Sequence, residues 1–204
     1  MPKKNLSLRG LHNKQKKCHP ELVSGSQRAC RIHNSEIPDQ VRNDKRAPVF
    51  IALGSSLGDR AGYLARALSE LDLLGELRTV SSIYETEPLG QSTQPFLNQV
   101  VELKTDLLPA ELLMHLKKIE KKLGRKKRAH WAEREIDLDI LLFGSLSLWR
   151  PELQIPHAEL AHRRFVLAPL AEIAPELPHP ALGLSMHELL NCCPDSLSVK
   201  KWKI

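Results

Sequence analysis

Two aspartates, Asp137 and Asp139, carry the clearest chemical signal in the sequence. The apolar residues around them keep the opposite parity: Ile136, Leu138, Ile140 and Leu142. Successive side chains leave a β-strand on opposite faces, so this pattern predicts a strand with both carboxylates on one face. Two like charges held this close raise the free energy of the fold unless cations neutralise them. The pair therefore predicts a site for one divalent cation or two.

Basic residues precede this strand. Arg125, Lys126, Lys127 and Arg128 form one run, and Arg134 lies shortly before the first aspartate. Carboxylate oxygens are ligands for Mg²⁺, while arginine and lysine bind phosphate. The order therefore predicts a magnesium–polyphosphate site. An isolated Asp-x-Asp is more often the solvent face of an edge strand, but the adjacent cationic loop argues against that alternative.

Periodicity predicts the elements that must position this strand. In chain order we expect a strand at 49–53, a helix between Asp59 and Gly75, strands at 77–84 and 97–104, and a helix from Pro109 to Gly124. With the central strand, this β-α-β-β-α-β order over residues 49–143 predicts a ferredoxin-like α+β fold. Extra C-terminal elements are expected as well: a short hairpin before 154–157, and helices at 165–173 and 184–190.

Two loops between these elements lead to different predictions. The turn at 54–59 lacks the Gly-Lys-Ser/Thr ending of a P-loop and the spacing of G-x-G-x-x-G, so we interpret it as a tight strand-to-helix turn. The loop from Glu85 to Pro95 is too long for a tight hairpin and is a candidate functional loop.

Length and composition indicate one main globular domain. The chain has 204 residues, enough to bury a core. No apolar run reaches the ~18 residues of a membrane span, and the N-terminus lacks the apolar region of a signal peptide. The four cysteines show no zinc spacing: Cys18, Cys30, Cys192 and Cys193. We therefore expect a cytoplasmic protein without membrane association, whose cysteines are incidental.

The formal net charge of +6 belongs to the N-terminal segment. Residues 1–47 hold 11 basic and 4 acidic residues, which leaves 19 basic and 20 acidic residues for 48–204. This nearly neutral remainder argues against a nucleic-acid-binding domain. We expect 1–47 to be a disordered basic extension and 48–204 to be the functional domain. A targeting or nucleic-acid arm, and translated upstream sequence, are the alternatives for the extension.

Several motifs occur in a fixed order between the first strand and the helix near Ile173. The most specific is the stretch His130–Leu141, HWAEREIDLDIL. The others are Ala52–Ser55, Ser81–Thr86, Pro88–Gly90, Phe96–Asn98, Gly124–Arg125, Ile155–His157 and Arg163–Phe165. Together they resemble the 6-hydroxymethyl-7,8-dihydropterin pyrophosphokinase family of folate biosynthesis. The resemblance implies transfer of pyrophosphate from ATP to the hydroxymethyl oxygen of the dihydropterin, with release of AMP.

The resemblance also implies roles for individual residues on the phosphate side. Asp137 and Asp139 would bind two Mg²⁺ ions, and Arg125 and Arg134 would contact the triphosphate; these four would be the catalytic residues. Further nucleotide contacts are implied for Trp131, Ile140, His157 and Arg163. ATP would be the co-substrate.

On the pterin side, the resemblance implies that Asn98 reads the edge of the pterin while Phe96 and Phe165 enclose its ring. The remaining lining of the pocket would come from Thr86, Pro88 and Leu89. Four positions depart from the family's usual pattern: Ser56, Glu87, Lys127 and Ala158. A flat ring with donors and acceptors on its edge suits aromatic faces and an amide.

Two other functions compete with this hypothesis. A different two-metal enzyme, such as a nucleotidyltransferase, also suits paired aspartates beside basic residues. An RNA-binding ferredoxin-like domain should carry strand aromatics in an RNP-like pattern, which 49–53 and 97–103 lack. We expect small molecules as partners, no nucleic acid, and a monomer.

Overall fold

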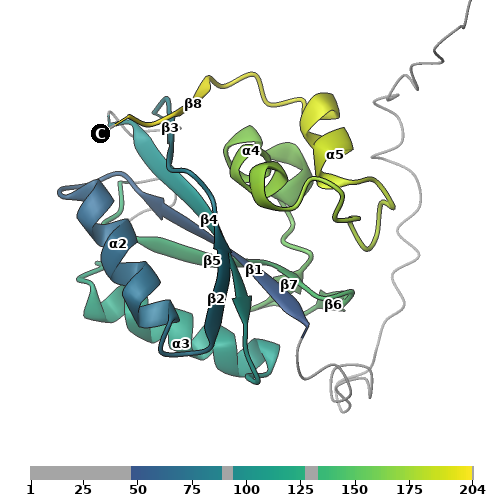
Figure 1. The fold of residues 1–204 in the computed structure, drawn as a ribbon. Helices are drawn as coiled ribbons and strands as arrows, with labels where there is room; N and C mark the ends of the chain where they lie inside the picture. The colour runs from purple at the N-terminus through teal and green to yellow at the C-terminus, as the bar shows by residue number, and fades with distance from the viewer. Residues whose placement is uncertain (1–46, 89–93, 127–132, 204) are drawn as a thin grey trace, which may run out of the picture. The chain divides into compact units, whose positions relative to one another are not determined.

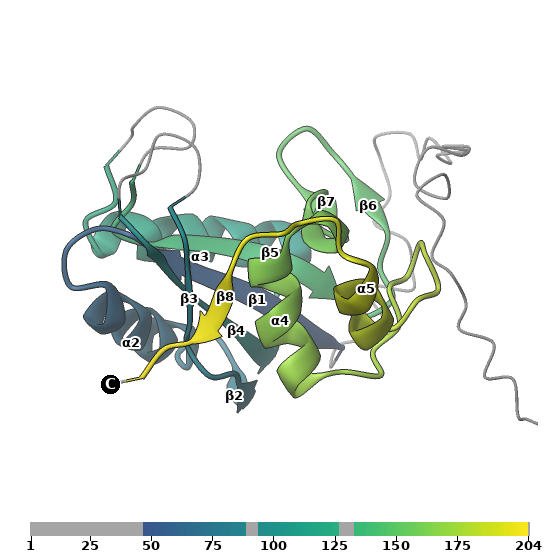
Figure 2. The same cartoon turned by 90° about the horizontal axis from the view of Figure 1, so that it is seen from above.

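The computed structural model describes residues 47–88, 94–126 and 133–203. The predicted extension 1–47 lies outside the described residues, apart from Ala47, which is buried. In these described ranges, no helix combines the length and the apolar character needed to cross a membrane. Figures 1 and 2 show a central sheet with helices on both of its faces.

The first half of the described chain supplies most of the sheet. Its elements are β1 (Pro48–Ser55), α2 (Arg60–Leu71), β2 (Glu76–Val80), β3 (Tyr84–Thr86), β4 (Phe96–Lys104), α3 (Pro109–Lys122) and β5 (Asp137–Phe143). The second half adds shorter pieces. They are β6 (Leu148–Trp149), β7 (Gln154–Ile155), the 3₁₀ turn η2 (Leu160–His162), α4 (Arg164–Ile173), α5 (Met186–Cys192) and β8 (Val199–Lys201).

The strands pair in the order β5-β1-β4-β3-β8, with β2 also paired to β4, and every pairing is antiparallel. Two interleaved β-α-β units produce this order, so the predicted ferredoxin-like α+β arrangement is confirmed. The turn at 54–59 is a strand-to-helix turn as predicted, with Gly58 at φ 66° and the Asp59 carboxylate accepting from the Gly62 amide (3.0 Å).

The strand predicted at 77–84 is in fact two strands. β2 pairs with the second half of β4 and β3 with the first half. The register shifts by one residue within β2, between Leu77 and Thr79, and by one more residue between β2 and β3. Between them, Ser81 takes over the pairing with Val100: its amide donates to the Val100 carbonyl (2.9 Å), and its hydroxyl accepts from the Val100 amide (3.0 Å). A side-chain oxygen thus replaces a backbone carbonyl, which ends one regular ladder and starts another.

Two apolar layers cover the sheet. Helices α2 and α3 pack on one face, in a layer that includes Ile51, Leu53, Leu64, Leu71, Val101, Leu112, Leu116 and Leu138. Helices α4 and α5 pack on the other face, in a layer that includes Phe50, Val100, Leu141, Leu142, Leu167, Leu170 and Met186. The strands are therefore covered on both sides, and the face with α4 and α5 also carries the polar residues described below.

The parity predicted for β5 is wrong at Leu142. The register with β1 runs from Ile51↔Ile140 to Phe50↔Leu142, so Leu141 is an extra residue and forms a β-bulge. Beyond the bulge the alternation reverses, and Leu142 packs in the layer of α4 and α5. The Leu141 carbonyl at this bulge accepts a hydrogen bond from the His157 amide (2.9 Å).

The last strand, β8, was not predicted from the sequence. It pairs with β3 at the end of the sheet, and the next residue, Trp202, donates its amide to the Ile83 carbonyl (2.8 Å) and packs on the core of α2 and α3. The Lys201 ammonium reaches the Glu172 carboxylate on α4 (2.7 Å). Three residues with two lysines carry too little alternation to signal a strand, so only the pairing reveals it.

A buried histidine forms hydrogen bonds within the segment between α4 and α5. His179 is 7% exposed, and its Nδ1 accepts from the amides of Ala181 and Leu182, both at 3.2 Å. Burial lowers the pKa of His179. The folded protein therefore binds this proton less readily than the unfolded chain, whose histidine titrates near pH ~6.5. The contribution of His179 to the free energy of unfolding is therefore complete above pH ~6.5. It is lost progressively as the pH falls from that value toward the lower pKa of the folded protein.

We expect His179→Asn to flatten this dependence, because an amide oxygen can accept the same bonds without titrating. Melting temperatures measured from pH 7 to pH 5 should fall less in the variant than in the wild type. His187 is exposed on α5, and His187→Asn is the matched control that should keep the wild-type slope. Parallel curves for wild type and His179→Asn would contradict the assignment.

Candidate active site

The register of three strands places the predicted site residues in one row. Gly54 of β1 pairs with Asp137 of β5 on one side and with Asn98 of β4 on the other. Asn98 in turn pairs with Tyr84 of β3. Neighbouring strands lie about 4.8 Å apart, so the carboxylate strand and the amide strand are roughly 10 Å apart across β1. The predicted phosphate half-site around Asp137 and the predicted pterin half-site around Asn98 thus share the face of the sheet that carries α4 and α5.

The residue between the two half-sites has no side chain. A Cβ at Gly54 would lie 3.5 Å from Asn98 Oδ1, which is an ordinary van der Waals contact. Neither strain nor a clash therefore demands glycine at this position. Its effect is instead to leave the floor between Asp137 and Asn98 flat, so that a ligand can lie against the backbone of β1.

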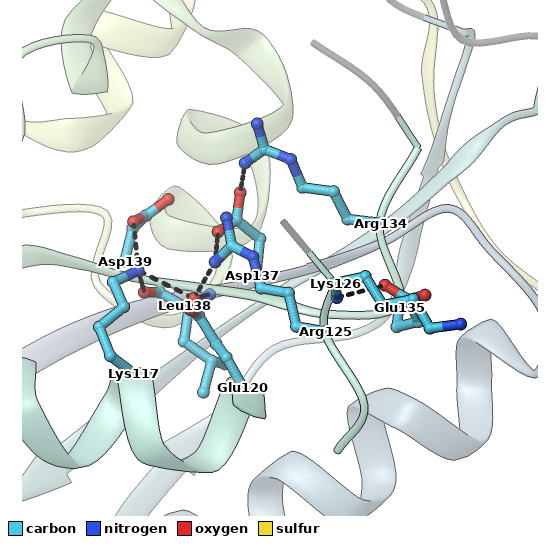
Figure 3. Close-up of polar contacts among 9 residues, drawn as sticks. All are labelled: Lys117, Glu120, Arg125, Lys126, Arg134, Glu135, Asp137, Leu138 and Asp139. Carbon is cyan, nitrogen blue, oxygen red and sulfur yellow. Dashed lines mark hydrogen bonds and ion pairs between the residues drawn. The ribbon is translucent and has the colours of Figure 1, made fainter. Parts of the chain in front are cut away.

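Two arginines converge on the first aspartate (Figure 3). Arg125 Nη1 donates to Asp137 Oδ1 (2.7 Å), and Arg134 Nη1 donates to Asp137 Oδ2. All three side chains are about one-quarter exposed. The two ends of the 125–134 loop thus meet at the same carboxylate. This geometry is consistent with the prediction that the two arginines and Asp137 belong to one site.

The turn after β1 fixes the position of Arg134. The amides of Ser56 and Leu57 both donate to the Arg134 carbonyl (3.0 and 3.1 Å), and the Arg134 amide donates to the Ser56 hydroxyl (3.0 Å). The Ser55 hydroxyl donates to the Glu135 carbonyl (2.6 Å). Ser56, which departs from the family's usual pattern, is buried and engaged in this contact. It holds the arginine backbone in this structure.

The second aspartate lies on the same face, as its parity predicted. The protein packed around the carboxylate, which leaves 43% of the side chain exposed, and the neighbouring Asp137 carboxylate both raise the pKa of Asp139. Lys117, His157 and Arg125 oppose this rise. The Lys117 ammonium lies 3.9 Å from Asp139 Oδ1. The two carboxylates thus lie on one face at the point where the sequence predicted a cation, with basic side chains around them.

The donor set fits Mg²⁺ held jointly with phosphates. Both predicted ligands are hard carboxylates, and both side chains are partly exposed. Among the described residues, no group of three or more His, Cys, Asp or Glu side chains could hold a metal without help. Mg²⁺ is commonly bound by one or two carboxylates plus substrate phosphate oxygens, which matches two aspartates flanked by arginines.

Three of the predicted pterin residues, Thr86, Phe96 and Asn98, lie at the other end of the row. The Asn98 amide donates to the Thr86 hydroxyl (3.0 Å), and both residues are buried. Phe96 opens β4 opposite Thr86, and Phe165 packs on the apolar layer of α4 and α5. Pro88 is exposed. Leu89 lies outside the described residues.

The predicted nucleotide residues are distributed around β5. His157 Nδ1 accepts from the Glu159 amide (3.3 Å), so its neutral form carries the proton on Nε2. Arg163 Nε donates to the Glu159 carboxylate (3.1 Å). The Ile140 side chain is buried in the layer of α2 and α3 and is not available for a nucleotide contact. Trp131 lies outside the described residues.

Sequence reasoning missed two residues of α3 that touch this site. Lys117 and Glu120 lie one turn apart and contact β5 between the two aspartates (Figure 3). On a helix, a Lys and a Glu three residues apart usually form a solvent-exposed pair. The available signal was that Glu120 falls on the apolar face of α3, beside Leu116 and Ile119.

Comparison with known proteins identifies the family. The model of the family described as 7,8-dihydro-6-hydroxymethylpterin-pyrophosphokinase (HPPK) matches residues 50–175. The chain belongs to this family. Curated relatives named 2-amino-4-hydroxy-6-hydroxymethyldihydropteridine pyrophosphokinase are 44% identical in Aquifex aeolicus, over 66% of this chain and 84% of the relative, and 44% identical in Pseudomonas aeruginosa, over 72% and 91%. The predicted family and activity class are confirmed: the chain is an ATP-dependent pyrophosphokinase of folate biosynthesis.

Solved structures show the same fold at low sequence identity. A Plasmodium falciparum HPPK-DHPS structure with pteroate aligns with a TM-score of 0.59 and 18% identity, and covers 72% of this chain. Its A437G variant aligns with a TM-score of 0.60 and 18% identity, again over 72% of this chain. The chain spans less than half the length of these two proteins, 42% and 45% respectively.

We expect Gly54→Ala to keep the fold and lose activity. The added methyl meets Asn98 only at contact distance, so the melting temperature should change little. The methyl would stand on the floor between the half-sites and displace a ligand by about 1 Å, which can cost on the order of 10²-fold in rate. Steady-state kinetics and thermal melts check this, and unchanged kcat/KM would show that the floor is not used.

Proposed function

We propose that this chain transfers pyrophosphate from ATP to the hydroxymethyl group of 6-hydroxymethyl-7,8-dihydropterin, giving the pterin diphosphate and AMP. The observation that supports this best is the row Asp137–Gly54–Asn98. A carboxylate pair with two arginines lies at one end, and a buried amide lies at the other. The names of the relatives specify the same substrate.

On the phosphate side, Arg125 and Arg134 would bind triphosphate oxygens, and Asp137 and Asp139 would hold two Mg²⁺ ions. When bound, Mg²⁺ neutralises phosphate oxygens and lowers the pKa of the attacking hydroxyl. His157 would donate from Nε2, because its Nδ1 already accepts the Glu159 amide. The family resemblance also assigns Arg163, Trp131 and the Ile140 backbone to the nucleotide.

On the pterin side, Asn98 would pair with the edge of the ring. Its amide nitrogen is already oriented by the Thr86 hydroxyl (3.0 Å), which leaves Oδ1 as the acceptor toward Gly54. The rings of Phe96 and Phe165 would enclose the pterin, and Thr86, Pro88 and Leu89 would line the remainder. Such a polar edge between apolar faces excludes water from the reacting hydroxyl.

The reaction needs positioning more than covalent help. The hydroxymethyl oxygen forms a bond to the β-phosphorus, the bond from that phosphorus to the oxygen bridging to the α-phosphate breaks, and AMP leaves with the electron pair. The hydroxyl proton passes to solvent. The two arginines stabilise charge on the transferred group, which is the largest contribution a protein makes to this kind of transfer.

Other features of the proposal follow from the sequence and the fold. Residues 48–204 would be the catalytic domain, working as a cytoplasmic monomer on small molecules and without nucleic acid. The near-neutral charge of this segment supports the absence of a nucleic-acid partner.

The product of the reaction tests the proposal. The protein should form AMP from ATP and Mg²⁺ only when the hydroxymethyl dihydropterin is present. Release of pyrophosphate instead would identify a nucleotidyltransferase. Salt-sensitive RNA binding without pterin-dependent use of ATP would identify a binding domain.

Single substitutions should separate the two half-sites. We expect Asp139→Asn to weaken Mg²⁺-dependent binding of an unreactive ATP analogue and to leave pterin binding in place. Asn98→Ala should weaken pterin binding by about 1–3 kcal/mol, the cost of leaving buried polar groups unpaired, and should affect the nucleotide less. Calorimetric titration measures both, and a variant that weakens both ligands equally would contradict the division.

A further inference from the structure

One buried charge beside the site has no role in the proposed contacts with ATP or the pterin. The Glu120 side chain, on the inner face of α3, is 4% exposed. Burial raises the pKa of Glu120, while Lys117, the Leu138 amide and Arg125 oppose the rise and favour the charged form. A carboxylate is rarely buried this deeply without a partner, so the contacts of Glu120 indicate what it does.

All the contacts of Glu120 lead to the site (Figure 3). Its Oε1 accepts from the Leu138 amide (2.9 Å) and from Lys117 Nζ (2.9 Å), and it pairs with Arg125 Nη1. Lys117 Nζ also donates to the Leu138 carbonyl (3.4 Å). Leu138 is the residue between the two aspartates.

The backbone of Leu138 needs these contacts because of its place in the sheet. β5 pairs with β1 and forms the end of the sheet in the described part of the chain. The Leu138 amide and carbonyl therefore find their partners on α3, where a neighbouring strand would otherwise supply them. Unpaired backbone groups at a covered edge cost stability and allow the strand to shift.

We infer that Glu120 is a positioning residue for pyrophosphoryl transfer. It holds the strand segment that carries Asp137 and Asp139, and it holds Arg125 where that guanidinium reaches Asp137. Lys117 completes the arrangement from the same helix, with its ammonium 3.9 Å from Asp139. Glu120 itself touches no substrate. This inference rests on the proposed function, since it assigns Glu120 to the phosphate half-site.

The two actions of Glu120 can be separated by substitution. Glu120→Gln keeps an oxygen for the Leu138 amide but removes the charge that holds Arg125. We expect kcat to fall by about tenfold or more, the scale of a misplaced charge contact, while the KM for the pterin and the melting temperature stay near wild type. The matched control is Glu70→Gln, which removes the Glu70–Lys122 pair between α2 and the outer side of α3 (2.8 Å) and should leave kcat unchanged.

A double-mutant cycle tests whether the effect passes through Arg125. In an Arg125→Ala background, Glu120→Gln should lower kcat by less than about twofold, because the group it positions is already absent. An equal loss in both backgrounds would overturn the inference. So would an unchanged kcat in Glu120→Gln, or a matching loss of pterin affinity and stability, which would mark a general structural role.

Hydrogen exchange gives a readout independent of catalysis. In the protein without ligands, Glu120→Ala should speed exchange of the Leu138 amide by about tenfold or more relative to core amides of β4, and Glu120→Gln should not. Unchanged exchange would overturn the strand-positioning part. If Glu120→Ala does not fold, Glu120→Gln and the cycle decide the inference. If the wild type makes no pterin-dependent AMP, the proposed function fails, while the exchange experiment still decides whether Glu120 holds the strand.

Discussion

The pairing of β1 with both β4 and β5 is the constraint on which the site depends. One strand fixes the register of two others, so Gly54 lies between Asp137 and Asn98. Side chains alternate along a strand. A slip of one residue in either pairing would therefore move one half-site to the opposite face of the sheet, into the core under α2 and α3. Apolar residues of β1, such as Ile51 and Leu53, are fully buried against α2 and α3. Their burial opposes such a slip, so core packing holds the polar row in place.

The second constraint is the balance of charge around β5. Asp137 contacts two arginines, Asp139 lies near Lys117, and Glu120 contacts Lys117 and Arg125. Partly buried carboxylates repel one another strongly, since little water screens them. The cations reach them from different elements, α3 and the two ends of the 125–134 loop. Donors oriented before the substrate arrives need no reorganisation during the reaction, which is the condition for effective electrostatic stabilisation.

Local patterns in the sequence predicted the elements and the common face of Asp137 and Asp139, because side-chain periodicity is a property of one segment. They failed where the outcome depends on a partner strand. The bulge at Leu141, which reverses Leu142, follows from the register with β1, and the break at Ser81 follows from the pairing with β4. The role of Glu120 was hidden for the same reason. The donor that its carboxylate binds is a backbone amide at a sheet edge, and a backbone amide leaves no trace in residue type.

The turn after β1 joins the floor at Gly54 to the backbone of Arg134 and Glu135. After Gly54, β1 ends at Ser55 and the chain continues into Ser56. The Ser55 hydroxyl donates to the Glu135 carbonyl, and the Ser56 hydroxyl accepts from the Arg134 amide. The floor and the backbone of Arg134 are therefore joined by hydrogen bonds within a few residues, independently of the rest of the 125–134 loop. Positions fixed by secondary structure are held more closely than positions on a free loop. The backbone of Arg134 is thus held by hydrogen bonds to the end of β1, although Arg134 lies before β5 begins. The same β1 backbone forms the floor beneath the proposed ligands, and the Arg134 guanidinium contacts Asp137 beside it.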